Sequence, residues 1–480
     1  MSQQRKEKSI LSKMMNLKIP IVVFPSKKKK ELSKKKVKPQ KLCTSLNCEC
    51  DCAKKPESGI FKAVHPKQHQ EKDKLGYPYP YPYPYDYYPY DSDLSDYDSS
   101  YYDSDSDHSH YHRRYLYGIK SNMTTGNYII TFNNSVHLDN KIANLNAMNG
   151  FKHKHKLTLA LYGCTASVNS NLLASLMNDP DIQTIERDSP VSDALHEKKE
   201  VTQMISPLWN QTITNTVPTA TDNFSTVHCY ILDTGIMANH TEFATGQVSI
   251  DFNAIAQNNL ASDDNGHGTA VASVLGGKTV GAAVHATLHA IKVLDSTGSG
   301  YTSDVIAGLD WVLTNKKSTG KVVINLSLGG SSNSNSLDSA IKNSILNNCV
   351  VVCAAGNGGV DASSLSPANA AGAFTISAYD STKTKPTWSN FGPVVASFAP
   401  GVSVKSAWNS ATNAYSLVSG TSFSSPITAG IIARYLKVIP RASQMQIATF
   451  LHKSSVVNEI INPGANTINA RIVWNAANAV

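Results

Sequence analysis

The stretch Val227-His228-Cys229-Tyr230-Ile231-Leu232-Asp233-Thr234-Gly235 (VHCYILDTG) indicates the fold most clearly, because an apolar run ends in a carboxylate and a glycine. Further short apolar runs follow it and alternate with stretches of helical character. We expect strands over 227–232, 287–294, 322–326, 349–355 and 374–378, and helices over 268–275, 303–314, 337–347 and 422–435. Alternation of this kind needs crossover connections, so the sequence predicts an α/β fold with a doubly wound, mainly parallel sheet and helices on both faces.

Three regions precede this part, which spans 205–480. Residues 127–190 are expected to form a small α+β domain, with strands over 128–132, 157–162 and 182–185 and a helix over 171–177. Residues 191–204 are polar and charged, and they are expected to form an exposed linker. Residues 1–117 combine Lys blocks with Tyr/Pro and Asp/Ser repeats, a composition typical of a disordered tail.

Charge is distributed unevenly along the chain, although the formal net charge is only +8. Residues 1–75 hold 20 basic and 7 acidic residues, residues 76–112 hold 8 acidic residues and no Lys or Arg, and residues 113–480 therefore carry only +3. This near-neutral remainder argues against a nucleic-acid-binding core. The basic tail remains open to four interpretations: a nuclear address, a contact with nucleic acid or another polyanion, packing into a larger assembly, or a merely solvated segment.

The cysteines and the apolar segments indicate where in or outside the cell the protein is expected to occur. Cys43, Cys48, Cys50 and Cys52 lack the spacing of structural zinc sites, so either a soft-metal site or a solvated tail is possible. The other four cysteines are scattered, and for Cys349 and Cys353, in or beside the apolar run 350–355, we expect buried thiols. No apolar run is long enough to span a membrane. The short run 19–24 lies between lysines and does not resemble a signal peptide, so we expect an intracellular protein, or one packaged in a particle such as a virion, rather than a secreted one.

Three motifs lie at the ends of expected strands or helices, where ligands of such sheets bind. Asp233 ends a strand, His267 opens a helix in NGHGT, and Ser422 opens another in GTSFSSP. A Ser hydroxyl is a weak nucleophile until a base takes its proton, and the base needs a carboxylate to orient it. We therefore expect Asp233, His267 and Ser422 to form a catalytic triad.

A fourth motif, AAGN, ends in Asn357 after the strand expected over 349–355. Its amide is suited to stabilise an oxyanion together with the Ser422 backbone N–H. Each motif alone is weak, but the four together, in the order Asp, His, Asn, Ser, indicate acyl transfer by a serine hydrolase.

These residues resemble those of subtilisin-like serine proteases (peptidase family S8), most of all the proteinase K branch. The chain order Asp, His, Ser is that of the subtilisins. The resemblance covers nearly all of 205–480, including HAIKVLDSTGSG (289–300), NLSLGG (325–330) and WSNFG (388–392). It implies a serine endopeptidase that acts on polypeptides and needs no cofactor for its chemistry.

The resemblance also implies a peptide cleft. One edge would be Gly300 and Tyr301 and the other Ser327, Leu328 and Gly329, with substrate added between them as an antiparallel strand. The pocket for the residue before the scissile bond would be lined by the uncharged residues Ala354, Ala355 and Gly356. We expect a broad preference for apolar or aromatic residues there, unlike the basic preference of the kexin and furin branch.

The sequence departs from the family at four positions near the triad: Ala270, Phe423, Ser424 and Ile427. None belongs to the triad, so they affect pocket shape and efficiency more than the reaction. The alternative interpretation is a catalytically weak or inactive binding or assembly protein with the same fold.

Residues 127–190 resemble the inhibitory propeptide (I9 type) of such proteases, notably in LMNDPDI (176–182) and IERD (185–188). The resemblance implies a zymogen that cuts itself within about 191–206, with Leu195 or Met204 before the cut. An unrelated small binding domain is the alternative.

A structural calcium ion is a further expectation from the resemblance. Asp380 aligns with a carboxylate ligand of one proteinase K site, and the carbonyls of Ala371 and Ala373 would be the other protein ligands. Calcium prefers oxygen ligands of this kind, although a lone loop Asp is also an ordinary turn residue.

Overall fold

The computed structural model describes residues 115–117, 124–201, 208–219, 222–316, 321–474. Met204 and nearly all of the basic and Tyr-rich tail, including its four cysteines, lie outside the described residues. The predictions made for the tail, among them polyanion contact and metal binding, therefore stay predictions.

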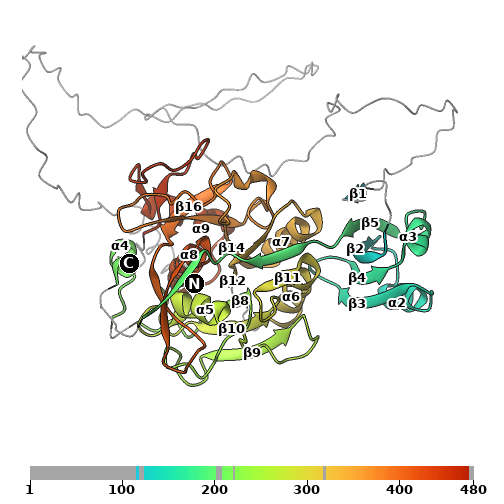
Figure 1. The fold of residues 1–480 in the computed structure, drawn as a ribbon, viewed down its shortest axis with the longest axis horizontal. Coiled ribbons are helices and arrows are strands. Elements are labelled where there is room, and N and C mark those ends of the chain that lie inside the picture. The colour runs from blue at the N-terminus through green and yellow to red at the C-terminus, as the bar shows by residue number, and fades with distance from the viewer. Residues whose placement is uncertain (1–114, 118–123, 202–207, 220–221, 317–320, 475–480) are drawn as a thin grey trace, which may run out of the picture. The chain divides into compact units, whose positions relative to one another are not determined.

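A nine-stranded sheet forms the centre of the large part, in the order β19-β20-β16-β15-β14-β12-β8-β10-β9 (Figure 1). All neighbouring strands are parallel except β19 and β20. The strands are β8 (His228–Asp233), β9 (Val248–Asn253), β10 (Thr287–Lys292), β12 (Val322–Leu326), β14 (Cys349–Ala354), β15 (Phe374–Tyr379), β16 (Val395–Pro400), β19 (Val456–Val457) and β20 (Arg471–Ile472). The predicted doubly wound, mainly parallel sheet is confirmed.

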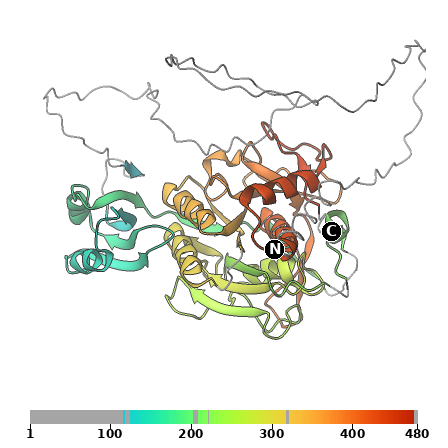
Figure 2. The same ribbon diagram turned by 180° about the vertical axis from the view of Figure 1, so that it is seen from behind.

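Helices cover both faces of this sheet (Figure 2). Helices α6 and α7 share one core cluster with alternate residues of β8, β12 and β14. Helices α5 and α8 pack against each other, α5 also against β8, and α8 against β12, β14, β15 and β16. The helices are α4 (Trp209–Thr214), α5 (His267–Gly276), α6 (Thr302–Asn315), α7 (Asn335–Leu346), the 3-10 turn η1 (Ala362–Ser364), α8 (Thr421–Val438) and α9 (Gln444–Ser454). Strands β12 (VVINL) and β14 (CVVVCA) are buried at every position, as parallel strands covered on both faces must be.

Asp233 lies where the order of the strands in the large sheet reverses its direction. β10 and β9 follow β8 on one side of the sheet, and β12, β14, β15 and β16 follow on the other. Asp233 ends β8 at this reversal, which is where sheets of this class form ligand sites.

A smaller five-stranded sheet, in the order β1-β5-β2-β4-β3, precedes the large one. Its elements are β1 (Tyr115–Tyr117), β2 (Gly126–Phe132), α2 (Leu138–Asn146), β3 (Phe151–Leu157), β4 (Gly163–Val168), α3 (Ser170–Leu176) and β5 (Ile182–Arg187). The strand expected over 157–162 is wrong: most of it is a loop, in which the N–H groups of Thr158, Leu159 and Ala160 bind the Asp310 carboxylate. Strand β3 (FKHKHKL) escaped prediction because its alternation is mainly polar.

The segment expected to be an exposed linker is instead largely strand. β6 (Pro190–Asp193) is the middle strand of the sheet β11-β6-β13, and β7 (Glu197–Val201) is an edge strand of the sheet β17-β18-β7. The partner strands are β11 (Ser299–Tyr301), β13 (Leu328–Gly330), β17 (Val404–Ala407) and β18 (Tyr415–Ser419). The polar side chains of this segment suggested a linker. Strands β6 and β7 are held by backbone hydrogen bonds to their partner strands, which the side-chain pattern does not reveal.

The described residues contain no helix that is both long enough and apolar enough to span a bilayer. The four cysteines in this part of the chain, Cys164, Cys229, Cys349 and Cys353, are buried and free, and for Cys349 and Cys353 the burial was expected.

Candidate active site

The carboxylate and imidazole of the predicted triad lie in contact. Asp233 Oδ1 lies 2.7 Å from His267 Nδ1 and accepts a second hydrogen bond from the Thr234 backbone N–H. Both side chains are fully buried. Asp263 fixes the surrounding loops, because its Oδ1 accepts hydrogen bonds from Thr234 Oγ1 and from the N–H of Gly266. The Nδ1 atom of His267 is thereby held toward the carboxylate, which leaves Nε2 to face the cleft.

Ser422 lies in the first turn of α8, immediately after Gly420 and Thr421. Its Oγ donates to the carbonyl of Ser327 at 3.1 Å, and within the described part of the chain His267 Nε2 has no hydrogen-bond partner. The hydroxyl is therefore turned away from His267 Nε2, and a hydrogen bond between the two atoms would require the Ser422 side chain to rotate.

The carbonyl of Ala194 occupies the predicted oxyanion position. Asn357 Nδ2 donates to it at 2.5 Å and the Ser422 N–H at 3.4 Å. Thr421 fixes the orientation of the Asn357 amide, because Asn357 Oδ1 accepts hydrogen bonds from both the N–H and the hydroxyl of Thr421. Gly420 has φ +153°, and a Cβ on it would lie 2.3 Å from the Ala194 oxygen. Only glycine leaves room there for the Ala194 carbonyl.

The predicted cleft edges enclose the chain's own β6. Gly300 pairs with Val191 on one side and Gly329 with Ser192 on the other, both antiparallel. The Ala194 N–H continues the second edge by donating to the Ser327 carbonyl at 3.1 Å. The remaining predicted edge residues, Tyr301 and Leu328, pair with Pro190 and Asp193. Residues 190–194 thus bind as an extended peptide would.

A cavity of about 560 Å³ adjoins Ala194. The predicted lining residues Ala354, Ala355 and Gly356 all contribute to it, and Leu365, Pro367 and Ala368 extend it. The methyl group of Ala194 fills little of this volume. In the described structure Asp193 is the one ionisable side chain on its wall, and it belongs to the bound segment itself.

The electrostatics of the site favour a protonated imidazole while residues 190–194 are in place. Burial disfavours the imidazolium, but the carboxylates of Asp233, Asp193 and Asp263 outweigh burial and raise the pKa of His267 to about 9. Burial and the neighbouring Asp233 also raise the pKa of Asp193, against the effect of His267.

The segment after Ala194 is also bound, which the sequence did not indicate. The His196 N–H donates to the Ser419 carbonyl at 2.8 Å, and β7 then pairs antiparallel with β18 from Glu197 to Val201. Both sides of the Ala194–Leu195 bond are therefore held by backbone ladders.

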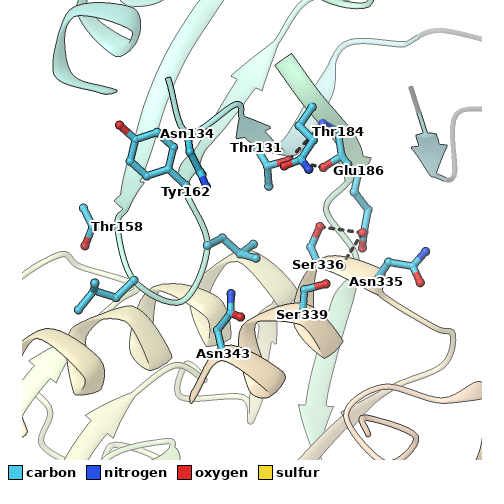
Figure 3. A pocket seen from close by; sticks show the side chains of 13 residues that line it. Thr131, Asn134, Thr158, Tyr162, Thr184, Glu186, Asn335, Ser336, Ser339 and Asn343 are labelled. Carbon is cyan, nitrogen blue, oxygen red and sulfur yellow. Dashed lines mark hydrogen bonds between the residues drawn. The ribbon is translucent and has the colours of Figure 1, made fainter. Parts of the chain in front are cut away.

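Two carboxylates of the small domain reach the N-termini of helices in the large part. Glu186 is 5% exposed and accepts from Ser334 Oγ and from the N–H and hydroxyl of Ser336, at the start of α7. Figure 3 shows Glu186 and Ser336 at the rim of a second cavity, of about 470 Å³. Asp188 accepts from the N–H and hydroxyl of Ser303 at the start of α6. Negative groups at helix N-termini are favourable, so these contacts hold the two parts together.

Asp380, the predicted calcium ligand, follows β15. Its Oδ1 accepts from the N–H and hydroxyl of Thr382 and from the Thr384 N–H, a pattern typical of a tight turn. Among the residues described, no group of three or more His, Cys, Asp and Glu side chains is arranged to hold a metal ion. One oxygen of Asp380 is left to join carbonyl ligands, so the residues fit a calcium ion only in part.

Comparison with known proteins agrees with this geometry. The profile of the Subtilase family (Peptidase S8) matches residues 226–474. The extracellular serine proteinase of Thermus sp. (strain Rt41A) is 40% identical over 313 residues, which are 64% of this chain and 74% of the relative. Subtilisin-like protease 2 of Pseudogymnoascus destructans is 35% identical over 349 residues, 70% of this chain and 86% of the relative.

The expectation of an intracellular or particle-packaged protein is wrong, because a relative matched over most of its length is named an extracellular proteinase. That expectation depended on the charges around the apolar run 19–24, and such charges do not determine where a protease acts.

A solved structure supports the same assignment. The crystal structure of a cold adapted subtilisin-like serine proteinase superposes with a TM-score of 0.52 at 32% identity, over 56% of this chain and 98% of the other. Members of this family need no cofactor for their chemistry. The chain belongs to the subtilase family and is a serine endopeptidase.

Proposed function

We propose that the protein is the uncut zymogen of this endopeptidase and that its first substrate is its own Ala194–Leu195 bond. The observation that carries the proposal is the pair of hydrogen bonds from Asn357 and Ser422 to the Ala194 carbonyl. These two donors face the oxygen on which negative charge develops during acyl transfer.

In the proposed mechanism Ser422 Oγ turns from the Ser327 carbonyl toward His267 and gives its proton to Nε2. The oxygen attacks the Ala194 carbonyl carbon, and the resulting oxyanion is stabilised by the Asn357 amide and the Ser422 N–H. Asp233 stabilises the imidazolium. His267 then protonates the Leu195 nitrogen, the peptide bond breaks, and an ester joins Ala194 to Ser422. Water, activated by the same imidazole, hydrolyses this ester.

The proposed position of the cut differs from the one expected from sequence. Leu195 and Met204 were the candidates for the residue before the cut, because both suit an apolar pocket. The contacts of Ala194 instead favour Ala194 in that place and Leu195 at the new N-terminus. Met204 lies outside the described residues.

The small domain is proposed to be the inhibitory propeptide. Its contacts through Glu186 and Asp188 support this role, since they survive the cut and keep residues 190–194 in the cleft. The separated enzyme would cleave other polypeptides, with apolar or aromatic residues in the pocket beside Ala354, Ala355 and Gly356. A calcium ion at Asp380 would stabilise the turn after β15 and takes no part in the chemistry.

Labelling with a serine-directed phosphonate tests the proposal. The processed wild-type protein should be labelled and should cleave a peptide substrate, whereas Ser422→Ala should do neither. If the wild-type protein is neither labelled nor able to cleave the peptide, the protein uses the protease fold for binding or assembly instead.

A further inference from the structure

The sheet formed by β17 and β18 binds the residues that follow the scissile bond, and nothing in the triad or the predicted pocket requires this. We propose that β18, Trp388 and Trp408 form a specificity site for the leaving side of substrates. The site selects extended polypeptides with a ring two residues beyond the cut and a cation four residues beyond it. This inference rests on the proposed function, because it takes Ala194–Leu195 as the bond that is cut.

The backbone contacts define the reach of the site. The ladder begins with the His196 N–H on the Ser419 carbonyl and continues through five paired residues, from Glu197 opposite Ser419 to Val201 opposite Tyr415. A peptide that adds to a sheet edge as an extra strand is held by backbone N–H and C=O groups, which are present whatever its sequence. The site therefore engages about seven residues after the cut, and short substrates do not use it.

Side chains supply the selectivity. Successive residues of a strand point to opposite faces, so His196 and Lys198 share one face. The His196 ring stacks on Trp388, with centroids 4.6 Å apart and planes at 24°. The Lys198 ammonium lies 4.4 Å from the centroid of the Trp408 ring. Glu197 and Lys199 lie on the other face of the strand. All four side chains are exposed, so the two faces differ in the rings that they meet and not in their burial.

The Trp408 ring is a fixed part of the enzyme. It is 6% exposed, and a Cβ on Gly266 would lie 2.4 Å from it, so the ring packs directly against the residue before His267. A ring held in this way does not have to be ordered when a substrate binds. Loss of the cation from a site of this kind is expected to lower kcat/KM about two- to fivefold.

Peptides of the sequence VSDALHEKKEV (residues 191–201), with a fluorophore and a quencher at the ends, test the inference on the processed enzyme. Lys198→Gln in the peptide should lower kcat/KM about two- to fivefold. Lys199→Gln is the matched control, because it removes the same charge from the opposite face, and it should leave kcat/KM nearly unchanged.

The enzyme variant Trp408→Leu completes a double-mutant cycle. Any general damage to the catalytic loop lowers the rates for all peptides alike, whereas the ratio between the parent and Lys198→Gln peptides should fall to about one. The parallel arm compares His196→Phe with His196→Ala peptides on wild type and Trp388→Leu, and only the wild type should prefer Phe.

Equal losses for Lys198→Gln and Lys199→Gln, or a Lys198 ratio unaffected by Trp408→Leu, would overturn the inference while leaving the protease intact. Failure of the proposed function looks different. In that case the parent peptide is not cut after Ala194, or its cleavage persists in Ser422→Ala.

Discussion

Replacing Glu186 with Gln tests how the propeptide-like domain is held on the catalytic part. The Glu186 carboxylate is buried and accepts three hydrogen bonds, one at Oε1 from Ser334 Oγ and two at Oε2 from the N–H and hydroxyl of Ser336. The start of α7 and its N-cap residue supply all three donors. Gln keeps the size and shape of Glu but removes the charge and one of the two acceptor oxygens.

The magnitude follows from the bonds that are lost. The substituted side chain can still accept at its single amide oxygen, while its amino group faces donors that it cannot satisfy. A hydrogen bond to a charged group contributes about 1.5–3 kcal/mol. The loss of one such bond should raise the Kd between the cut propeptide and the enzyme about 10- to 150-fold, since every 1.4 kcal/mol is a factor of ten.

The assay uses the self-cut complex, diluted over a series of concentrations and equilibrated before peptidase activity is measured. Activity appears as the propeptide dissociates, so the midpoint gives the Kd. Asp139→Asn is the control, because Asp139 pairs with the exposed Lys156 on the surface of the small domain. If Glu186→Gln stayed within twofold of wild type, the contact at α7 would not be what holds the propeptide.

Four further outcomes follow from the site. Asn357→Ala removes one of two oxyanion donors, so kcat on peptides should fall about 10²- to 10³-fold with little change in KM; a rise in KM at unchanged kcat would assign Asn357 to binding. The first cut needs neutral His267, whose pKa is raised to about 9 in the uncut chain, so its rate should rise with pH and level off above about 9. Asp193→Asn removes one of the carboxylates that raise this pKa and should move the midpoint of the rate profile, followed by gel densitometry, to lower pH; an unmoved midpoint would contradict the assigned electrostatics. Mass spectrometry of a cleaved peptide library should show apolar and aromatic residues before the cut, because the cavity of about 560 Å³ offers a Lys or Arg no carboxylate of the catalytic part among the residues described; a predominance of Lys or Arg would exclude this interpretation of the pocket.

The sequence predicted the catalytic fold well because buried parallel strands have an unmistakable pattern. The strand Val322–Leu326 has the bounds predicted for it, and Asp233 is the last residue of a strand that is otherwise mainly apolar. Asp233, His267, Asn357 and Ser422 were predicted as site residues because they lie at the ends of expected strands or helices. These residues lie close together in the structure, since the topology of the sheet gathers those ends at one edge.

The segment around the cut could not be predicted, because its structure depends on partners far away in the chain. Strands β6 and β7 are mostly polar and become strands only by pairing with β11, β13 and β18. For the same reason, the sequence could not indicate which residue lies before the proposed cut. An apolar side chain at Leu195 suggested the residue before the cut, but the backbone ladders set the register and bring Ala194 to Asn357.

The N-terminus of the mature enzyme tests the central claim most directly. Wild type and Ser422→Ala are expressed side by side, without other proteases, and compared by intact mass and N-terminal sequencing. The account predicts that wild type yields a new N-terminus at Leu195 and that Ser422→Ala stays uncut. A mature N-terminus at another residue, or maturation of the Ser422→Ala chain, would contradict it.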